Sequence, residues 1–313
     1  MKILITEPYS LHSKARLKAA GFDLREDAGA LADAEILLIR SRTVIDAEFL
    51  ARAPKLKLIV SATSGFDHID WRLCQSRDVV VAHTPSANAQ STAELALSLM
   101  LNVERDILAA HKNVKANHWR DGLRRPHGLD GKTLGIIGLG RVGQKVANMA
   151  YTFGMRLQAH DPYVDETLFP AFHCERMGLI EVLTTSDYVT LHVPLTKETR
   201  YLMNNPTFGE MQSEAVLINT CRGAVVNQND LIDALDSGTI AAAAMDVIER
   251  EPPPRGHRVL THPRLLLTPH IGAYTESAWN RGCNEAVDKV LRFQAAQPVG
   301  DTLPLATRWF HLT

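Results

Sequence analysis

The sequence predicts an α/β protein with two domains, each built on a doubly wound parallel sheet. Three observations support this prediction. The chain has 313 residues, a length that suits about two domains. Short apolar runs typical of buried strands alternate with longer helical patterns along almost the whole chain. The apolar runs form two series, and a glycine-rich turn follows the first strand of the second series.

The first series of predicted strands lies before residue 90. Its strands cover residues 2–6, 35–39, 56–60 and 78–82, and the segments between them, such as 10–20 and 46–53, have a helical pattern. A long helical pattern with few helix-breaking residues then covers residues 90–117. We expect a long helical segment here.

The second series of predicted strands covers residues 133–138, 155–160, 187–193, 214–220, 239–247 and 265–269. A final helical pattern at residues 275–297 is expected to return to the first unit. We therefore predict a discontinuous first domain, residues 1–98 and 277–313, with a second domain, residues 99–276, inserted into it. A cleft between the two domains is the expected place for a small-molecule site.

The composition argues against several classes of function. The net charge of −1 gives no reason to expect nucleic acid or an anionic membrane as a partner. Cys74, Cys174, Cys221 and Cys283 are widely scattered, which predicts reduced thiols rather than disulfides or metal ligands. The first ten residues are typical of a strand rather than a signal peptide, and no stretch approaches the roughly 18 apolar residues of a membrane span. We therefore expect a cytoplasmic protein without a metal site.

The glycine-rich turn predicts a dinucleotide site. Gly138, Gly140 and Gly143 form a GxGxxG pattern directly after an apolar strand and before an amphipathic helix, a context that an ordinary tight turn does not require. The first glycine allows the turn, the second lets the backbone approach a pyrophosphate, and the third lets the helix pack on the strand. Asp161 ends the next predicted strand, 18 residues after Gly143. A carboxylate there would bind ribose hydroxyls and repel a 2′-phosphate, which favours NAD over NADP.

Polar side chains follow three later strands of the second series. Arg222 follows the strand that ends at Thr220, Asp246 and Glu251 follow the next strand, and His270 follows the last one. Each has an ordinary alternative as a surface ion pair, a solvated loop acid or a turn histidine. Because ligands bind beyond the carboxyl ends of parallel strands, their grouping near the dinucleotide site favours a shared function.

These side chains suit hydride transfer coupled to proton transfer. Oxidation of a secondary alcohol needs a base near neutrality, for which histidine is the natural candidate. A carboxylate beside the imidazole would orient it and raise its pKa, and a guanidinium can grip a carboxylate or polarise a carbonyl. The residues therefore predict a substrate with an alcohol next to a carboxylate, and a nicotinamide that carries the hydride. The residues alone do not decide whether Glu249 or Glu251 is the partner of His270.

The chain resembles the D-isomer-specific 2-hydroxyacid dehydrogenase family over nearly its whole length. Five blocks in family order carry the resemblance: IGLGRVG, HVPLTKETR, LINTCRGAVV, AMDVIEREP and LTPHIGAYT. It implies an NAD-dependent enzyme with a flavodoxin-like substrate domain, an inserted Rossmann NAD-binding domain and a homodimeric assembly. It also implies that Arg222 orients the substrate, that His270 is the acid/base and that Glu251 is its partner. The residues that it implies for the cofactor site are Gly138, Gly140, Arg141, Val142, Gly143, Asp161, His192, Val193, Pro194, Thr199, Thr220, Cys221, Asp246 and Gly272, with Asp246 at the nicotinamide carboxamide.

Within the family, the first domain resembles enzymes that act on phosphorylated substrates. Arg40 and Arg42, in IRSRT, resemble arginines that bind the substrate's phosphate in phosphoglycerate dehydrogenases; the alternative is a pair of solvated charges at a strand end. Ser64 and Gly65 lie where family members present backbone amides to the substrate carboxylate. The leading expectation for the substrate is therefore 3-phosphoglycerate, with its 2-oxo acid as the oxidised partner, and erythronate 4-phosphate comes next.

Three positions depart from the family pattern. Ser61 stands where some phosphoglycerate enzymes carry arginine, Thr63 where many members have glycine, and Asn227 where aspartate is usual. These departures bear on the substrate rather than on the reaction. A second class of function is an NAD-sensing binding protein, because the transcriptional corepressors of this family keep a similar set of residues. Turnover of a hydroxy acid distinguishes the two.

Overall fold

The computed structural model describes residues 1–312, which form two compact units. Unit 1 consists of Met1–Ala89 and Ala273–Phe310, and unit 2 consists mainly of Gln90–Gly272. The first segment of unit 1 ends at residue 89, whereas the sequence placed the domain boundary after residue 98. The difference arises because helix α4 (Ala89–Arg105) supplies Ala93, Ala96 and Leu97 to the core of unit 2. Within the described residues, no helix is long and apolar enough to cross a membrane.

Unit 1 contains a six-stranded sheet in the order β13-β5-β4-β3-β1-β2. Its strands are β1 (Lys2–Ile5), β2 (Asp23–Arg25), β3 (Ile36–Ile39), β4 (Leu58–Ser61), β5 (Val80–His83) and β13 (Thr302–Leu303). The first five strands are parallel and have the flavodoxin-like order, in which the winding direction switches between β1 and β3. The predicted parallel sheet is confirmed, and β13 adds an antiparallel edge strand beside β5 that was not predicted.

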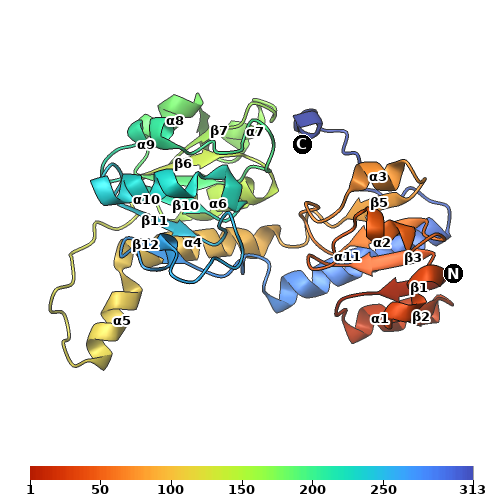
Figure 1. The fold of residues 1–313 in the computed structure, drawn as a ribbon. Helices are drawn as coiled ribbons and strands as arrows, with labels where there is room; N and C mark the ends of the chain where they lie inside the picture. The colour runs from red at the N-terminus through yellow and green to blue at the C-terminus, as the bar shows by residue number, and fades with distance from the viewer. Residues whose placement is uncertain (313) are drawn as a thin grey trace. The chain divides into compact units, whose positions relative to one another are not determined.

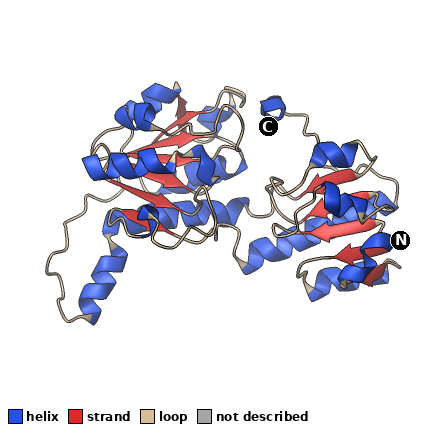
Figure 2. Cartoon of the chain, in the orientation of Figure 1, coloured by secondary structure: helices blue, strands red, loops and turns tan. Residues whose placement is uncertain are grey.

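Helices cover both faces of this sheet, as Figures 1 and 2 show. They are α1 (Leu11–Ala19), α2 (Ala47–Ala51), α3 (Trp71–Gln75) and α11 (Glu276–Gln294), with short 3₁₀ turns η1 (Ala28–Asp33) and η4 (Arg308–Leu312). Successive side chains of a strand point to opposite faces of the sheet, so the strands contribute to two separate cores, one on each face. Leu17 of α1 and Val287 of α11 pack in one core, and Leu50 of α2 and Cys74 of α3 pack in the other.

Unit 2 contains a seven-stranded parallel sheet in the order β12-β11-β10-β9-β6-β7-β8. The strands are β6 (Thr133–Ile137), β7 (Arg156–His160), β8 (Cys174–Arg176), β9 (Tyr188–Leu191), β10 (Val216–Asn219), β11 (Ala242–Met245) and β12 (Leu265–Leu267). This is the Rossmann order extended by one strand, and its winding direction switches between β6 and β9. The predicted second parallel sheet is confirmed. Ligands of such sheets bind at the switch point, beyond the carboxyl ends of the strands.

The helices of unit 2 include two that form the long helical segment after unit 1. They are α4, α5 (Ile107–Lys115), α6 (Arg141–Thr152), α7 (Leu168–Ala171), α8 (Leu179–Thr185), α9 (Asn205–Gly209) and α10 (Gln228–Ser237), with 3₁₀ turns η2 (Gly223–Val225) and η3 (Arg258–Leu260). The long helical pattern predicted at residues 90–117 forms two helices, because Asp106 adopts a left-handed φ of 46° between α4 and α5. Helix α5 buries no residue, and Figure 1 shows it extending away from the sheet of its unit.

Candidate active site

The turn between β6 and α6 has the geometry that a dinucleotide-binding turn needs. Gly138 has a φ of 96°, and a Cβ there would lie 2.6 Å from the carbonyl oxygen of His192. A Cβ on Gly143 would lie 2.1 Å from the carbonyl oxygen of Gly138, so both positions exclude larger residues. A Cβ on Gly140 would meet no atom within 4 Å. Gly140 thus leaves an open approach to the N-terminus of α6, whose N–H groups and dipole favour a phosphate.

Asp161 follows β7 and hydrogen-bonds to the turn between β6 and α6. Its two carboxylate oxygens accept hydrogen bonds from the backbone N–H groups of Leu139 and Tyr163, each at 2.9 Å. A carboxylate has about four acceptor sites, so acceptor capacity remains for ribose hydroxyls. The hydroxyl of Tyr163 donates to Glu198, which brings an acid from the loop after β9 to the loop that follows β7.

The ends of β9 and β10 carry buried polar atoms that suit a ligand. His192 is hydrogen-bonded to Thr190 through Nε2 at 2.9 Å, and burial lowers the pKa of His192 to about 3, so that its ring is neutral. The Nδ1 atom of His192 and the hydroxyl of Thr220 are buried without a hydrogen-bond partner among residues 1–312. Unsatisfied buried polar atoms are uncommon in folded proteins. Together with the open turn at Gly140, they fit a dinucleotide at the switch point.

The other residues expected at the cofactor also lie at this edge of the sheet. The hydroxyl of Thr199 donates to the carbonyl oxygen of Pro194 at 2.6 Å and so closes the loop after β9. Burial raises the pKa of Cys221 to about 11, which makes it a neutral thiol. The remaining residues are Arg141 and Val142 in the first turn of α6, Val193 beside Gly138, and Gly272 at the end of unit 2.

Arg222 lies in a turn after β10 that is built around a fully buried asparagine. Oδ1 of Asn219 accepts a hydrogen bond from the N–H of Cys221, and Nδ2 donates to the carbonyl oxygen of Arg222, both at 3.0 Å. The guanidinium Nη1 of Arg222 donates to the carbonyl oxygen of Cys221 at 2.7 Å. A Cβ on Gly223 would lie 2.0 Å from the carbonyl group of Ile248. The turn therefore packs directly on the loop after β11.

His270 and Glu251 form a close pair. Nδ1 of His270 lies 2.6 Å from one carboxylate oxygen of Glu251, and the other oxygen accepts a hydrogen bond from the N–H of Ile248 at 3.1 Å. Because a carboxylate only accepts, Nδ1 carries the proton and Nε2 is the ring nitrogen available to a substrate. The two side chains are 50% and 37% exposed. Glu249, in contrast, is hydrogen-bonded to the hydroxyl of Tyr201.

The pair shifts both pKa values toward the charged forms. The hydrogen bond and the negative charge of Glu251 raise the pKa of His270, although burial and the nearby Arg222 oppose this. Burial by itself would raise the pKa of Glu251, but the hydrogen bond and charge of His270 hold it below its usual value. His270 also has a φ of 54°, a left-handed conformation that is uncommon outside glycine and recurs at functional sites.

Asp246 supports the loop that carries His270. Its side chain is 2% exposed, and its carboxylate accepts hydrogen bonds from the hydroxyl of Thr268 at 2.6 Å and from the N–H groups of Ile271 and Gly272 at 2.8 Å. Its carbonyl oxygen accepts the N–H of His270 at 2.8 Å. Most of the acceptor capacity of Asp246 is therefore used inside the protein. Its contact with the nicotinamide carboxamide stays a prediction.

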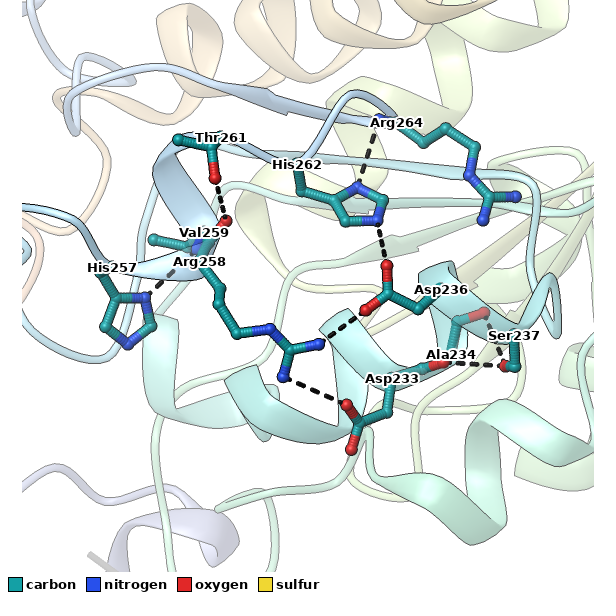
Figure 3. A network of polar contacts seen from close by, with 10 residues as sticks. All are labelled: Asp233, Ala234, Asp236, Ser237, His257, Arg258, Val259, Thr261, His262 and Arg264. Atoms are coloured by element: carbon teal, nitrogen blue, oxygen red, sulfur yellow. Dashed lines mark hydrogen bonds and ion pairs between the residues drawn. The ribbon is translucent and has the colours of Figure 1, made fainter.

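A polar network ties the segment after Glu251 to α10 (Figure 3). Arg258 lies 3.4 Å from Asp233 and 2.6 Å from Asp236, and His262 lies 3.2 Å from the other carboxylate oxygen of Asp236. Arg258 and both carboxylates are more than half exposed, and ion pairs between exposed groups contribute about 0–1 kcal/mol each to stability. We therefore assign the network to holding this segment in place rather than to chemistry.

In unit 1, the predicted substrate residues lie at the carboxyl edge of the sheet. Arg40 follows β3 at the switch point, and Arg40 and Ser64 help to line one small cavity. Gly65 is the neighbour of Ser64 in the loop after β4, and Arg42 is exposed. The carboxylate of Glu7, which follows β1, accepts hydrogen bonds from the N–H groups of Arg40 at 2.8 Å and Arg42 at 3.2 Å. Glu7 therefore organises the turn that carries both arginines.

Sequence reasoning missed two residues that shape these sites, Glu7 and Asn219. Both follow or end a strand at the carboxyl edge, which is the only signal in the sequence that could have indicated them. That signal is weak, because an acid or an amide often ends a strand without any function. Arg222, Glu251 and His270 come together within unit 2, whereas Arg40, Arg42, Ser64 and Gly65 belong to unit 1.

The chain is similar in sequence and fold to known dehydrogenases and reductases. Residues 97–272 match a family model described as the NAD-binding domain of D-isomer specific 2-hydroxyacid dehydrogenases. A hydroxypyruvate reductase from Thermotoga maritima is 36% identical, and the match covers 90% of this chain and 92% of that protein. The structure of a D-lactate dehydrogenase from Aquifex aeolicus, complexed with NAD and lactic acid, is 27% identical with a TM-score of 0.86, covering 98% of this chain and all of that one.

Longer relatives match as well. A D-3-phosphoglycerate dehydrogenase from Methanocaldococcus jannaschii is 36% identical over 96% of this chain. This chain spans only 59% of that protein's length, and it spans 54% and 51% of the corresponding enzymes from Archaeoglobus fulgidus and Bacillus subtilis.

Proposed function

The chain belongs to the D-isomer-specific 2-hydroxyacid dehydrogenase family, and we propose on this basis that it transfers a hydride between NAD and C2 of a small D-2-hydroxy acid. The hydrogen bond of 2.6 Å between His270 and Glu251, with Arg222 close enough to influence both pKa values, is the observation that carries the proposal. An imidazole, a carboxylate and a guanidinium are the groups that this reaction requires.

His270 is the proposed acid/base. In the oxidation direction, Nε2 of the neutral ring accepts the hydroxyl proton of the substrate, and in the reduction direction the protonated ring returns it. Glu251 holds the ring by its Nδ1–H and stabilises the imidazolium that forms. The guanidinium of Arg222 orients the substrate through its carboxylate or its C2 oxygen. When bound, NAD supplies the hydride acceptor, and NADH the donor.

The cofactor site is proposed at the switch point between β6 and β9. The pyrophosphate would lie on Gly140 and the first turn of α6, and Asp161 would bind the ribose hydroxyls. His192 and Thr220 offer their unsatisfied polar atoms to the nicotinamide half of the cofactor. The charge of Asp161 supports a preference for NAD over NADP.

The proposed substrate is 3-phosphoglycerate. Arg40, at the switch point of unit 1, and its neighbour Arg42 support a phosphate group on the substrate, and the phosphoglycerate dehydrogenases among the relatives agree with it. Erythronate 4-phosphate has the same two anionic groups. Unphosphorylated glycerate is the second candidate, because the hydroxypyruvate reductase is matched over 92% of its length.

Initial rates of NADH formation with 3-phosphoglycerate, erythronate 4-phosphate, D-glycerate and D-lactate test this proposal. We expect the highest kcat/KM with 3-phosphoglycerate. A higher kcat/KM for D-glycerate would reject the phosphate role of the arginines. Tight NAD binding without turnover of any hydroxy acid would reject the enzyme and favour an NAD-sensing binding protein.

We also propose a homodimer that uses the segment around α5. Ile107, Leu108, Val114 and Trp119 are each at least 47% exposed, and α5 buries none of its residues. A second copy of the chain would cover these side chains, because exposed clustered apolar groups mark association sites. Light scattering should give twice the mass of 34.6 kDa, and Leu108→Asp with Trp119→Asp should return it to the monomer value.

A cytoplasmic location is proposed from the cysteines. The four thiols are free, and burial raises the pKa of Cys74 to about 11 and that of Cys174 to about 12. Such thiols suit a reducing compartment. Fractionation of the source cells would test the location.

A further inference from the structure

The loop after β4 has two backbone carbonyl groups that are held by side chains. The carbonyl oxygen of Ser64 lies 2.8 Å from Nδ1 of His83, and the carbonyl oxygen of Gly65 accepts a hydrogen bond from the hydroxyl of Thr63 at 2.8 Å. His83 ends β5, where it is the register partner of Ser61 at the end of β4. The two carbonyl groups are therefore anchored to the sheet of unit 1.

The direction of these hydrogen bonds follows from their acceptors. A carbonyl oxygen only accepts, so His83 carries its proton on Nδ1, and the single proton of the Thr63 hydroxyl goes to Gly65. The oxygen of Thr63 then accepts from the hydroxyl of Ser61 at 2.6 Å, and the oxygen of Ser61 accepts from Nε2 of His68 at 3.3 Å. A relay of defined direction thus ends on the carbonyl group of Gly65.

Ser61 and His83, which anchor the loop to the sheet, are themselves buried. Ser61 is fully buried and His83 is 3% exposed. The ring of His83 also meets the ring of Phe66 edge to face, with centroids 5.4 Å apart. His83 therefore holds the loop at both Ser64 and Phe66.

The geometry of the peptide bond gives this anchoring a consequence on the opposite side of the loop. In a planar trans peptide, the N–H of each residue points away from the carbonyl group of the residue before it. The N–H groups of Gly65 and Phe66 therefore point away from His83 and Thr63. Neither N–H has an acceptor within residues 1–312, and the neighbouring Ser64 lines the small cavity beside Arg40.

We propose that Thr63 and His83 are positioning residues, which turn the N–H groups of Gly65 and Phe66 toward the carboxylate of the 2-hydroxy acid. The inference rests on the proposed function. It also gives a role to Ser61 and Thr63, whose hydroxyl groups form the relay at two positions where the chain departs from its family. Two preoriented N–H donors lower the cost of ordering a bound carboxylate.

Thr63→Val, which keeps the shape of the side chain and removes its hydroxyl, is the central test. We expect KM for the best hydroxy acid to rise about fivefold, the scale of one lost hydrogen bond, while kcat and the Kd for NAD stay within about twofold. Thr63→Ser should restore KM. His83→Leu should raise KM in the same way, and His83→Asn, which keeps a donor, should recover most of it. Ser76→Ala, which removes an exposed hydroxyl–carbonyl bond in the same unit, is the matched control.

A second measurement separates this inference from the proposed function. Oxamate, a carboxylate that resembles a 2-oxo acid, is titrated into the full chain with NADH present, and the amide NMR signals of Gly65 and Phe66 are followed. Movement of these two signals in the wild type, with weaker oxamate binding by Thr63→Val, would support the inference even if no hydroxy acid is turned over. Unchanged oxamate affinity and KM in Thr63→Val, with only a lower Tm, would overturn it.

Discussion

The imidazole of His270 is hydrogen-bonded to Glu251 through Nδ1, 2.6 Å from the carboxylate, which leaves Nε2 outside this bond as the proposed site of proton exchange. This bond also sets the direction in which the pKa of His270 moves. Glu251 raises that pKa by its hydrogen bond and its charge, so the protonated ring persists to a higher pH than in free histidine.

Glu251→Gln should shift the pH profile to lower pH. Without the carboxylate, His270 loses its proton earlier, so reduction of the 2-oxo acid should fall off at lower pH and oxidation should begin at lower pH. Profiles of kcat/KM for both directions, in wild type and variant, measure the shift. Superimposable profiles would mean that Glu251 does not control the titration of His270.

The same pair predicts a stability that depends on pH. The raised pKa of His270 contributes stability that is complete below its unfolded value of about 6.5 and is lost as pH rises through the folded value. The lowered pKa of Glu251 contributes stability that is complete above about 4.5 and is lost as pH falls through the folded value. The Tm difference between wild type and Glu251→Gln should therefore be largest between about pH 4.5 and 6.5 and smaller on either side.

His270→Ala should lower kcat on the order of a hundredfold or more, the usual effect of losing a positioned acid/base. The Kd for NAD should change little, because the proposed cofactor contacts lie mainly elsewhere. His12→Ala, at an exposed histidine of α1, is the control for a histidine removed without function. A His270→Ala enzyme with near-normal kcat would show that another group is the base.

Two glycines of the turn after β6 should respond in opposite ways. The added methyl of Gly140→Ala meets no protein atom, so the Tm should stay near wild type. The Kd for NAD should rise at least tenfold, because the methyl would lie where the pyrophosphate is proposed to bind. Gly143→Ala places its Cβ 2.1 Å from a carbonyl oxygen and should lower the Tm. Gly209→Ala, which also meets no atom, controls for the change in composition. Unaltered NAD binding in Gly140→Ala would place the pyrophosphate elsewhere.

Asp161→Ala should weaken NAD and reduce the discrimination against NADP. The change removes the proposed acceptor for the ribose hydroxyls and the negative charge that would repel a 2′-phosphate. The ratio of kcat/KM for the two cofactors is the measurement. Asp165→Ala, at an exposed acid of the same loop that accepts hydrogen bonds from Thr167, is the control. An unchanged ratio would count against the role of Asp161.

Glu7→Ala should raise the KM for a phosphorylated substrate several-fold and leave the Kd for NAD unchanged. The carboxylate accepts the N–H groups of Arg40, Arg42 and Thr43, so its loss should loosen the turn that carries both arginines. Glu35→Ala is the matched control, because Glu35 accepts a backbone N–H at the opposite edge of the same sheet. Equal KM values for Glu7→Ala and Glu35→Ala would mean that the turn carrying Arg40 and Arg42 does not contact the substrate.

The main strands were predictable because apolar runs in parallel sheets are buried on both faces. The short strands β2, β8 and β13 were not, because segments such as Asp23–Arg25 have no apolar run and depend on a neighbouring strand for their conformation. The helical pattern of residues 90–117 did not locate the break at Asp106. Aspartate enters the left-handed region more often than most residues but still uncommonly, and the local pattern on both sides is helical.

Site residues were predictable where they belong to a motif whose spacing has a chemical reason. They were not predictable where one side chain hydrogen-bonds to a turn far away in the sequence. The glycines after β6 follow a motif with a physical reason at each position. Glu249 and Glu251 could not be separated from the residues alone, since the choice depends on which carboxylate reaches the loop of His270. Glu7 accepts hydrogen bonds from residues 33 to 36 positions away, a relationship that no local pattern contains.

The discontinuous layout of unit 1 has a consequence for biosynthesis. Residues 90–272 are contiguous, so unit 2 can complete its sheet as soon as Leu265–Leu267 has left the ribosome. Unit 1 must wait for α11, which supplies Cys283, Ala286, Val287 and Val290 to the core on one face of its sheet. Until then, the first 89 residues expose that apolar face. Residues 1–89 therefore leave the ribosome before unit 2 but complete their core after it, which reverses the usual N-terminal-first order of domain folding.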